Sequence, residues 1–438
     1  MNSIGHSGLW SSLRRQGPHV WLLALLPFYP SLLLPFLLLI ILLLSFSREK
    51  RASKRKLPRS LVFALIFSVA GFLFSALSLQ WSVNKETAWS SLETQLSFLL
   101  LPLVFWRFFR AGRFAFSLHQ MDGYVAGNLL VFGVCLIRAT FRAISYGGAV
   151  FVNDLGFERN VFTYAEFSQF LMHPGYLTLF TGVSVLYLLV QVIPNQMWAS
   201  WKSTSVLALL FLFMFMLQGR MPLLAVFLTA FAFGSAHLVK SWDKRVALRA
   251  AVGVGIASGL MFLLPRHFYQ RYLAMPDFNY EISAPVSAFN SATMRLAEWK
   301  CAVKALEEAP FVGVGLGDRT QKLLDAYASE GFQVGIDFRY NAHNQFLETM
   351  LSTGALGLLF LLGMLASYAV YFSKARDRMA SAILILFILS MLTESLFERA
   401  WAVVLFNVLI PVLAFGGFFS HSNESVHAQN QISHQRDL

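Results

Sequence analysis

Charged residues are few in this sequence. They account for 13% of its 438 residues, while hydrophobic residues account for 56%. A soluble domain of this length has no core that could bury so much apolar surface. The composition therefore excludes a soluble globular protein and indicates a protein that lies in a lipid bilayer.

Cysteine is nearly absent as well. Cys135 lies within an apolar run and Cys301 lies in a more polar segment, so we do not expect the two to form a disulfide. Two separated thiols also provide no cysteine-ligated metal site. The sequence therefore predicts neither a disulfide nor a metal centre built from cysteine.

Acidic residues are outnumbered by basic ones, and the net charge is +12. The basic residues occupy short segments between apolar runs instead of one continuous face, so we expect no nucleic-acid partner. In a membrane protein, lysine and arginine mark the cytoplasmic loops. We therefore interpret the positive charge as a sign of membrane topology.

Long apolar runs are abundant. A transmembrane helix needs roughly 20 apolar residues, and the pattern predicts an all-α polytopic membrane protein with about 11 or 12 transmembrane helices. The count depends on whether the prolines of the first run break it into two crossings. The runs cover residues 20–46, 61–80, 92–109, 122–142, 173–193, 203–218, 221–239, 247–264, 346–372, 379–394 and 400–420.

The loop between the first two runs sets the orientation. Residues 47–60 contain seven basic residues, which place this loop on the cytoplasmic side. Alternation of the later runs then puts segments 143–172 and 265–345 outside the cytoplasm, together with the short links at 218–220 and 394–399. Arg14 and Arg15 fit this scheme only if the first run crosses twice.

The runs also suggest a division of the chain. We predict an N-terminal transmembrane bundle at 1–264, an extracytoplasmic loop unit at 265–345, C-terminal transmembrane helices at 346–420 and a disordered tail at 421–438. A loop of about 80 residues is uncommon as a simple connector, so we expect it to fold. The tail is polar and lacks periodicity, which is typical of disorder.

The middle of the long loop has a helical pattern. Apolar residues recur at Met294, Ala297, Cys301 and Ala305, which predicts an amphipathic helix with Ser291 or Thr293 as its N-cap. Pro310 would stop it.

Three glycines follow this helix. Gly313, Gly315 and Gly317 resemble a nucleotide-binding glycine loop, but they come after a helix instead of a strand and lie outside the cytoplasm. We therefore predict a tight turn in which backbone approaches backbone.

Several polar residues beside the predicted spans could act chemically. His343 precedes the ninth run and could take a proton near neutral pH, although a capping or interfacial histidine is the plainer alternative. Arg220 and Arg295 could bind diphosphate oxygens with their planar guanidinium groups. The alternative for each arginine is an interfacial side chain that reaches lipid headgroups, and this alternative is stronger for Arg266 and Arg271.

Three further ionisable residues are weaker candidates. His173 could line a cavity, but a histidine before a proline at a helix start is usual capping context. Glu394 and Glu398 beside apolar spans hint at a polar cavity. Pairing of Glu398 with a nearby arginine would also explain its position.

Four segments, taken together, resemble the O-antigen ligase and O-antigen polymerase superfamily of bacterial envelope glycosyltransferases. They are QGRMPLLA from residue 218, RLAEWKCAVKALEEAPFVGVGLGD from 295, AHNQFLETMLSTGALGLLFLL from 342 and ESLFERAWAVVLFNVLI from 394. Their order and spacing cover roughly the second half of the chain, and FTYAEFSQFLMHPGYLTLF from 162 resembles a branch of the same superfamily.

This resemblance implies a GT-C membrane fold, the bacterial inner membrane, and a site that faces the periplasm. The donor would be a glycan on undecaprenyl diphosphate, the acceptor lipid A core or another glycan, and no metal or cofactor would be needed. The essential loop histidine of the family would be His343, and its diphosphate-binding arginines would be Arg295 and Arg220. Gly219 stands where the family usually has serine.

The chemistry is consistent with these residue types. Guanidinium groups stabilise the negative charge that develops on a departing diphosphate. A histidine base can activate an acceptor hydroxyl, and direct displacement would invert the anomeric centre.

Three alternative functions stay open. They are a polymerase of the same superfamily, a transporter or flippase for lipid-linked glycans, and a silent scaffold. A transporter is expected to place charges in mid-membrane.

Overall fold

The computed structural model describes residues 23–28, 56–110, 120–152, 158–195, 197, 200–241 and 280–416. Most of the first apolar run, the run at 247–264, Arg266, Arg271 and the tail at 421–438 lie outside these residues. Two compact units share the chain: unit 1 contains Met1–Pro35 and Ser117–Met275, and unit 2 contains Phe36–Phe116 and Pro276–Leu438.

The chain is an all-α polytopic membrane protein, as predicted. Within the residues that the structure describes, five helical segments are long and apolar enough to cross a bilayer. They are Arg59–Gln80, Lys85–Arg107, Gln120–Ser145, Pro174–Val192 and Gln345–Ala375. Four shorter apolar helices are Trp201–Leu217, Arg220–Phe233, Arg378–Met391 and Ala400–Gly416. Among the described residues the β-structure is confined to one antiparallel hairpin of β1 (Val150–Val152) and β2 (Glu158–Asn160).

Unit 1 is built around α9, whose residues are almost all buried. Its helices are α7 (Gln120–Ser145), α8 (Tyr164–Ser168), α9 (Pro174–Tyr187), which continues as a short π-helix at Leu188–Val192, α10 (Ser200–Leu217) and α11 (Arg220–Ser241). The helix α9 packs against α7, α10 and α11.

Buried polar groups join α7 to α9. Tyr187 donates a hydrogen bond to Asp122 (2.8 Å), and the Asn128 amide donates to Ser184 (3.0 Å). Such bonds satisfy polar groups that lipid cannot. His173 is the N-cap of α9, and its Nδ1 accepts from the Gly175 N–H at 3.2 Å. The capping alternative for this histidine is therefore the one observed.

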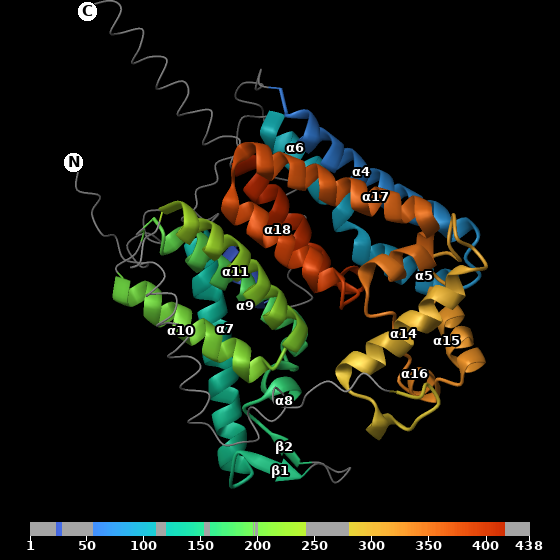
Figure 1. Ribbon diagram of the computed structural model, residues 1–438, viewed down its shortest axis with the longest axis horizontal. Helices are drawn as coiled ribbons and strands as arrows, with labels where there is room; N and C mark the ends of the chain where they lie inside the picture. Colours follow the sequence, from blue (N-terminus) through green and yellow to red (C-terminus); the bar gives the residue numbers. More distant parts are fainter. Residues whose placement is uncertain are drawn as a thin grey trace, which may run out of the picture. The chain divides into compact units, whose positions relative to one another are not determined.

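Unit 2 combines early and late parts of the chain. It contains α4 (Arg59–Leu77), α5 (Lys85–Gln95), α6 (Ser97–Arg110), α14 (Ser291–Leu306), α15 (Arg319–Glu330), α16 (Gln333–Asp337), α17 (Gln345–Ala375), α18 (Arg378–Met391) and the last apolar helix, Ala400–Gly416. The most extensive packing in this unit is between α4 and α17, which run side by side (Figure 1). Gly71 permits this approach, since a Cβ there would lie 3.3 Å from Phe360 Cβ.

The predicted loop helix is confirmed as α14. Its buried face carries Ala297, Cys301 and Ala305, which pack with α15 and α16 in a small core. The predicted N-cap, Ser291 or Thr293, is wrong, because the cap is Asn290. Asn290 Oδ1 accepts from the N–H groups of Ala292 and Thr293, and Thr293 Oγ1 accepts from the Asn290 N–H. This reciprocal capping box uses Thr293 as the third helical residue. The helix ends at Leu306, before Pro310.

The segment 313–317, called the glycine loop below, packs against a break in α17. Gly354 has φ +65° and interrupts the helix, so the carbonyls of Leu351 and Ser352 lose their usual helical partners. They accept instead from Val314 N–H (2.9 Å) and Gly315 N–H (3.0 Å). In return, the N–H groups of Ala355 and Leu356 donate to the carbonyls of Pro310 and Phe311 at 2.8 and 3.2 Å.

Close approach explains why glycines are needed here. A Cβ on Gly313, whose φ is +69°, would lie 2.5 Å from the Ser352 carbonyl carbon, and one on Gly317 would lie 2.0 Å from the Asn84 carbonyl oxygen. The predicted turn, in which backbone approaches backbone, is therefore confirmed. Its partners are α17 and the segment between α4 and α5.

Candidate functional site

His343 lies in the short segment that leads into α17. The side chain of Asn344 caps that helix by accepting from the N–H groups of Phe346 (3.0 Å) and Leu347 (3.1 Å). His343 itself has φ +40°, and its N–H donates to Asn341 Oδ1 at 3.0 Å. The imidazole is 27% exposed, so one side of it remains accessible while its backbone is fixed.

The imidazole is paired with Glu298 of α14. Nδ1 of His343 lies 2.9 Å from Oε2 of Glu298, and the glutamate side chain is fully buried. Burial disfavours the charged imidazole, but the hydrogen bond and the charge of Glu298 outweigh it and raise the pKa of His343 above its usual value of 6.5. Burial also raises the pKa of Glu298. The pair therefore holds its proton more firmly than a free histidine does.

Glu298 was missed by the sequence reasoning, although a signal for it exists. It lies on the same side of α14 as Ala297, Cys301 and Ala305, which form the buried face. An acidic residue on the buried face of an amphipathic helix requires a partner. The sequence does not identify that partner, because His343 is 45 residues away.

Arg295 lies one helical turn before Glu298 and makes three intramolecular contacts. Its Nη2 donates to Glu394 Oε1 at 2.5 Å, its Nε to the Thr393 carbonyl at 2.9 Å and its Nη1 to the Ser291 carbonyl at 3.0 Å. The Arg295 side chain is 17% exposed. Its charge acts on both His343 and Glu298, so the structure brings two of the predicted site residues into one charged cluster.

Arg220 begins α11 in unit 1, after a residue with positive φ at Gln218. The glycine before it is explained by packing, because a Cβ on Gly219 would lie 2.3 Å from Thr178 Oγ1. Arg220 belongs to one unit and His343 and Arg295 to the other. The convergence of Arg220 with these two residues therefore stays a prediction.

A second charged group lies beneath the His343 segment. Arg319 is buried, its Nε lies 3.1 Å from Glu348 Oε1, and its Nη2 donates to Glu398. The pairing of Glu398 with an arginine is thus observed. The other oxygen of Glu348 accepts from the Ala342 N–H at 3.0 Å, which connects this ion-pair group directly to the residue before His343.

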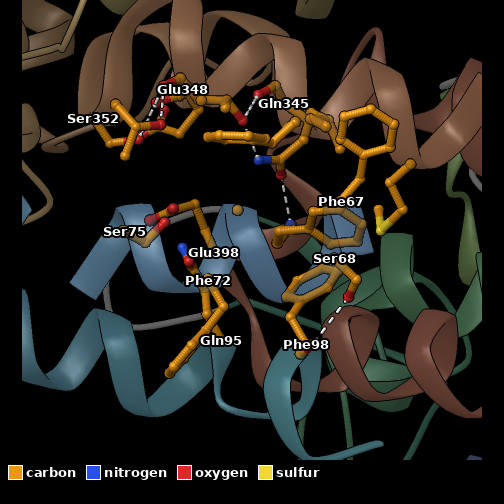
Figure 2. A pocket seen from close by; sticks show the side chains of 18 residues that line it. Phe67, Ser68, Phe72, Ser75, Gln95, Phe98, Gln345, Glu348, Ser352 and Glu398 are labelled. Atoms are coloured by element: carbon orange, nitrogen blue, oxygen red, sulfur yellow. Dashed lines mark hydrogen bonds between the residues drawn. The ribbon is translucent and has the colours of Figure 1, made fainter. Parts of the chain in front are cut away.

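A pocket adjoins this group. Figure 2 shows Gln345 and Glu348 of α17 on one side and Phe72 and Ser75 of α4 on the other. Phe67, Phe360, Leu361 and Met364 line it farther along the two spans, and Glu398 and Gln95 add polar groups. The pocket therefore has a polar end near the His343 segment and an apolar end among membrane helices.

The described residues contain no group of three or more histidine, cysteine, aspartate or glutamate side chains placed to hold a metal ion. The side chains of the site can perform two kinds of chemistry: proton transfer at His343 and anion binding at Arg295. Proton transfer suits a substrate hydroxyl group, and anion binding suits a negatively charged group, which can belong to a second substrate.

A comparison with protein families found a match that covers this region. Residues 205–362 match the model of a protein family described as O-antigen ligase. The matched region contains Arg220, Arg295, Glu298 and His343, and it ends within α17. The resemblance drawn from the motifs is thereby confirmed. A comparison with curated proteins gave no match.

Proposed function

Because residues 205–362 carry an O-antigen ligase domain, we propose that this membrane protein is a glycosyltransferase of the ligase type. It moves a glycan from undecaprenyl diphosphate to an acceptor hydroxyl on lipid A core. The observation that carries this proposal is the cluster of His343, Glu298 and Arg295, in which an imidazole and a guanidinium from separate segments lie together within the matched region.

In the proposed reaction, His343 takes the proton from the acceptor hydroxyl as its oxygen attacks the anomeric carbon. The bond between that carbon and the diphosphate oxygen breaks, and the electron pair leaves with the diphosphate. Direct displacement inverts the anomeric centre. No metal is assigned a role, because arginine can stabilise the leaving charge by itself.

Arg295 and Arg220 are proposed as the diphosphate ligands, with Arg266 and Arg271 as weaker candidates. Arg295 uses three of its five N–H groups within the protein. The other two have no hydrogen-bond partner among the described residues and could bind phosphate oxygens, and an incoming diphosphate would also compete with Glu394. A planar guanidinium group can exchange the Glu394 carboxylate for a phosphate group, because both kinds of oxygen accept its N–H groups in the same geometry.

The pocket between α4 and α17 is proposed to receive part of the lipid carrier. Its apolar end is lined by phenylalanines of two helices long enough to cross a membrane. Its polar end contains Gln345 and Glu348, which lie in the first turn of α17 directly after the His343 segment. A substrate with a prenyl chain and a charged head would match this gradient.

We further propose that the protein lies in the bacterial inner membrane with His343 on the periplasmic side, in a GT-C fold. The positive-inside pattern of the sequence supports this orientation. Lipid-linked glycans with a completed sugar chain would meet their acceptor on that side.

The test begins with deletion of the gene and electrophoresis of envelope glycans. A ligase is supported if polymer disappears from lipid A while polymer persists on the carrier. Single repeat units on lipid A would indicate a polymerase, and unchanged glycans with a blocked solute flux would indicate a transporter.

Complementation with His343→Ala should fail, while His173→Ala should restore the glycans. His173 is a matched control because its imidazole caps a helix in unit 1. Full activity of the His343 variant would contradict the proposed base.

A further inference from the structure

We propose that Glu298 is the positioning residue of the catalytic histidine. It holds Nδ1 of His343 as a hydrogen-bond donor, which leaves Nε2 as the atom that accepts the proton of the acceptor hydroxyl. This inference rests on the proposed function and adds a residue that neither the sequence motifs nor the family match assigns.

The geometry gives Glu298 little freedom. Its carboxylate is 2.9 Å from the imidazole and fully buried. The helix that carries it is fixed at its start by the Asn290 capping box and along its length by the core residues Ala297 and Cys301. A carboxylate held in this way sets the direction of the imidazole ring instead of following it.

The imidazole is restrained from other sides too. The ring of Tyr340 meets it edge-on with centroids 5.7 Å apart. The His343 backbone has a left-handed φ that its N–H bond to Asn341 maintains. With Nδ1 directed at Glu298, the neutral ring must carry its proton there, and the lone pair lies on Nε2.

One carboxylate oxygen has no hydrogen bond. Oε1 of Glu298 is buried and has no partner among the described residues. Burial of a polar atom without a partner lowers the stability of the folded state. Glu298 therefore lowers the stability of the fold, and its contact with His343 explains why a glutamate occupies this position.

The surrounding charges support the same role. Glu298 and Glu394 favour the protonated imidazole, while Arg295 and burial oppose it, and the pKa of His343 is raised on balance. Glu348 of α17 also interacts with His343. The imidazolium that forms when the acceptor loses its proton is therefore stabilised mainly by the buried carboxylate.

The experiment compares Glu298→Gln with Glu307→Gln in the full-length protein in detergent. Glu307 is an exposed residue at the end of the same helix. The substrates are carrier-linked glycan extracted from the deletion strain and lipid A core from the same strain. Glutamine keeps the shape of the side chain but removes its charge and presents either an N–H or a carbonyl to Nδ1.

We expect Glu298→Gln to lower kcat by roughly 100-fold, a typical contribution of a positioned acid–base group, with the donor KM and the thermal midpoint unchanged. The wild-type rate should rise with pH and reach half its maximum above pH 6.5, because the base form appears only above the raised pKa. In Glu298→Gln this midpoint should move to lower pH, since the imidazolium loses its stabilising carboxylate. Glu307→Gln should match the wild type.

Retention of full kcat and of the wild-type pH midpoint in Glu298→Gln would overturn the inference. A collapse of the thermal midpoint would also overturn it, because Glu298 would then be structural. These failures are separate from failure of the proposed function, which would appear as wild-type activity in His343→Ala.

Discussion

Nη2 of Arg295 lies 2.5 Å from Oε1 of Glu394, although the two residues are 99 positions apart in the chain. The arginine proposed to bind the donor diphosphate thus already has an anionic partner. Donor and carboxylate would compete for the same guanidinium.

Removal of this competitor should strengthen donor binding. We expect Glu394→Gln to lower the donor KM by about two- to fivefold, which corresponds to the roughly 0.5–1 kcal/mol of a partly exposed ion pair. Steady-state kinetics with carrier-linked glycan measures the change. Glu330→Gln removes two ion pairs, with the exposed Lys300 and Lys304, and should leave the KM unchanged. A higher KM in Glu394→Gln would show that the pair orients Arg295 instead of competing for it.

The break in α17 should depend on glycine. Gly354 has φ +65°, and a Cβ there would lie 2.3 Å from the carbonyl of Phe311. We expect Gly354→Ala to destabilise the protein by about 3 kcal/mol or more through strain and overlap. Thermal unfolding in detergent would measure this. Gly133→Ala in α7 is the control, since its Cβ would meet no atom within 4 Å, and equal midpoints for the two variants would contradict the prediction.

The buried ion-pair group should be sensitive to loss of its cation. Arg319→Met leaves the buried Glu348 and the partly buried Glu398 without their shared arginine, which we expect to reduce the free energy of unfolding by about 3–5 kcal/mol. Denaturation in detergent provides the measurement. Lys322→Ala on the same helix removes a pair with the exposed Glu308 and should cost less than about 1 kcal/mol. A small effect of Arg319→Met would mean that the carboxylates find protons or other partners.

The glycine loop is also held by a carboxylate. Asp318 accepts from Val83 N–H at 2.6 Å and Asn84 N–H at 2.9 Å. We expect Asp318→Ala to lower stability by about 2 kcal/mol, because hydrogen bonds to charged groups are stronger than neutral ones. Limited proteolysis should then cut more readily near residues 83 and 318. Asp325→Ala, which loses one exposed bond to Gln321, is the control and should not change the digestion pattern.

The sequence predicted His343 and Arg295 as site residues but named none of the side chains that the structure places around them. Both lie in short recognisable motifs, and each belongs to a residue type with a clear chemical role. Glu298 lies within one of the same motifs, yet its role depends on a contact with a residue 45 positions later. Arg319 gave no local signal, because its two acidic partners come from α17 and from the segment after α18.

The sequence by itself determined that this chain crosses the membrane, and it predicted the membrane helices that the described residues contain and the segments that could carry chemistry, because apolar length and helical periodicity are local properties. Tertiary structure alone decided that Glu298 faces His343, that Glu394 neutralises Arg295, and that the glycine loop bonds to the break in α17. These contacts join segments far apart in the chain. Their distances depend on how helices pack, which no local pattern specifies.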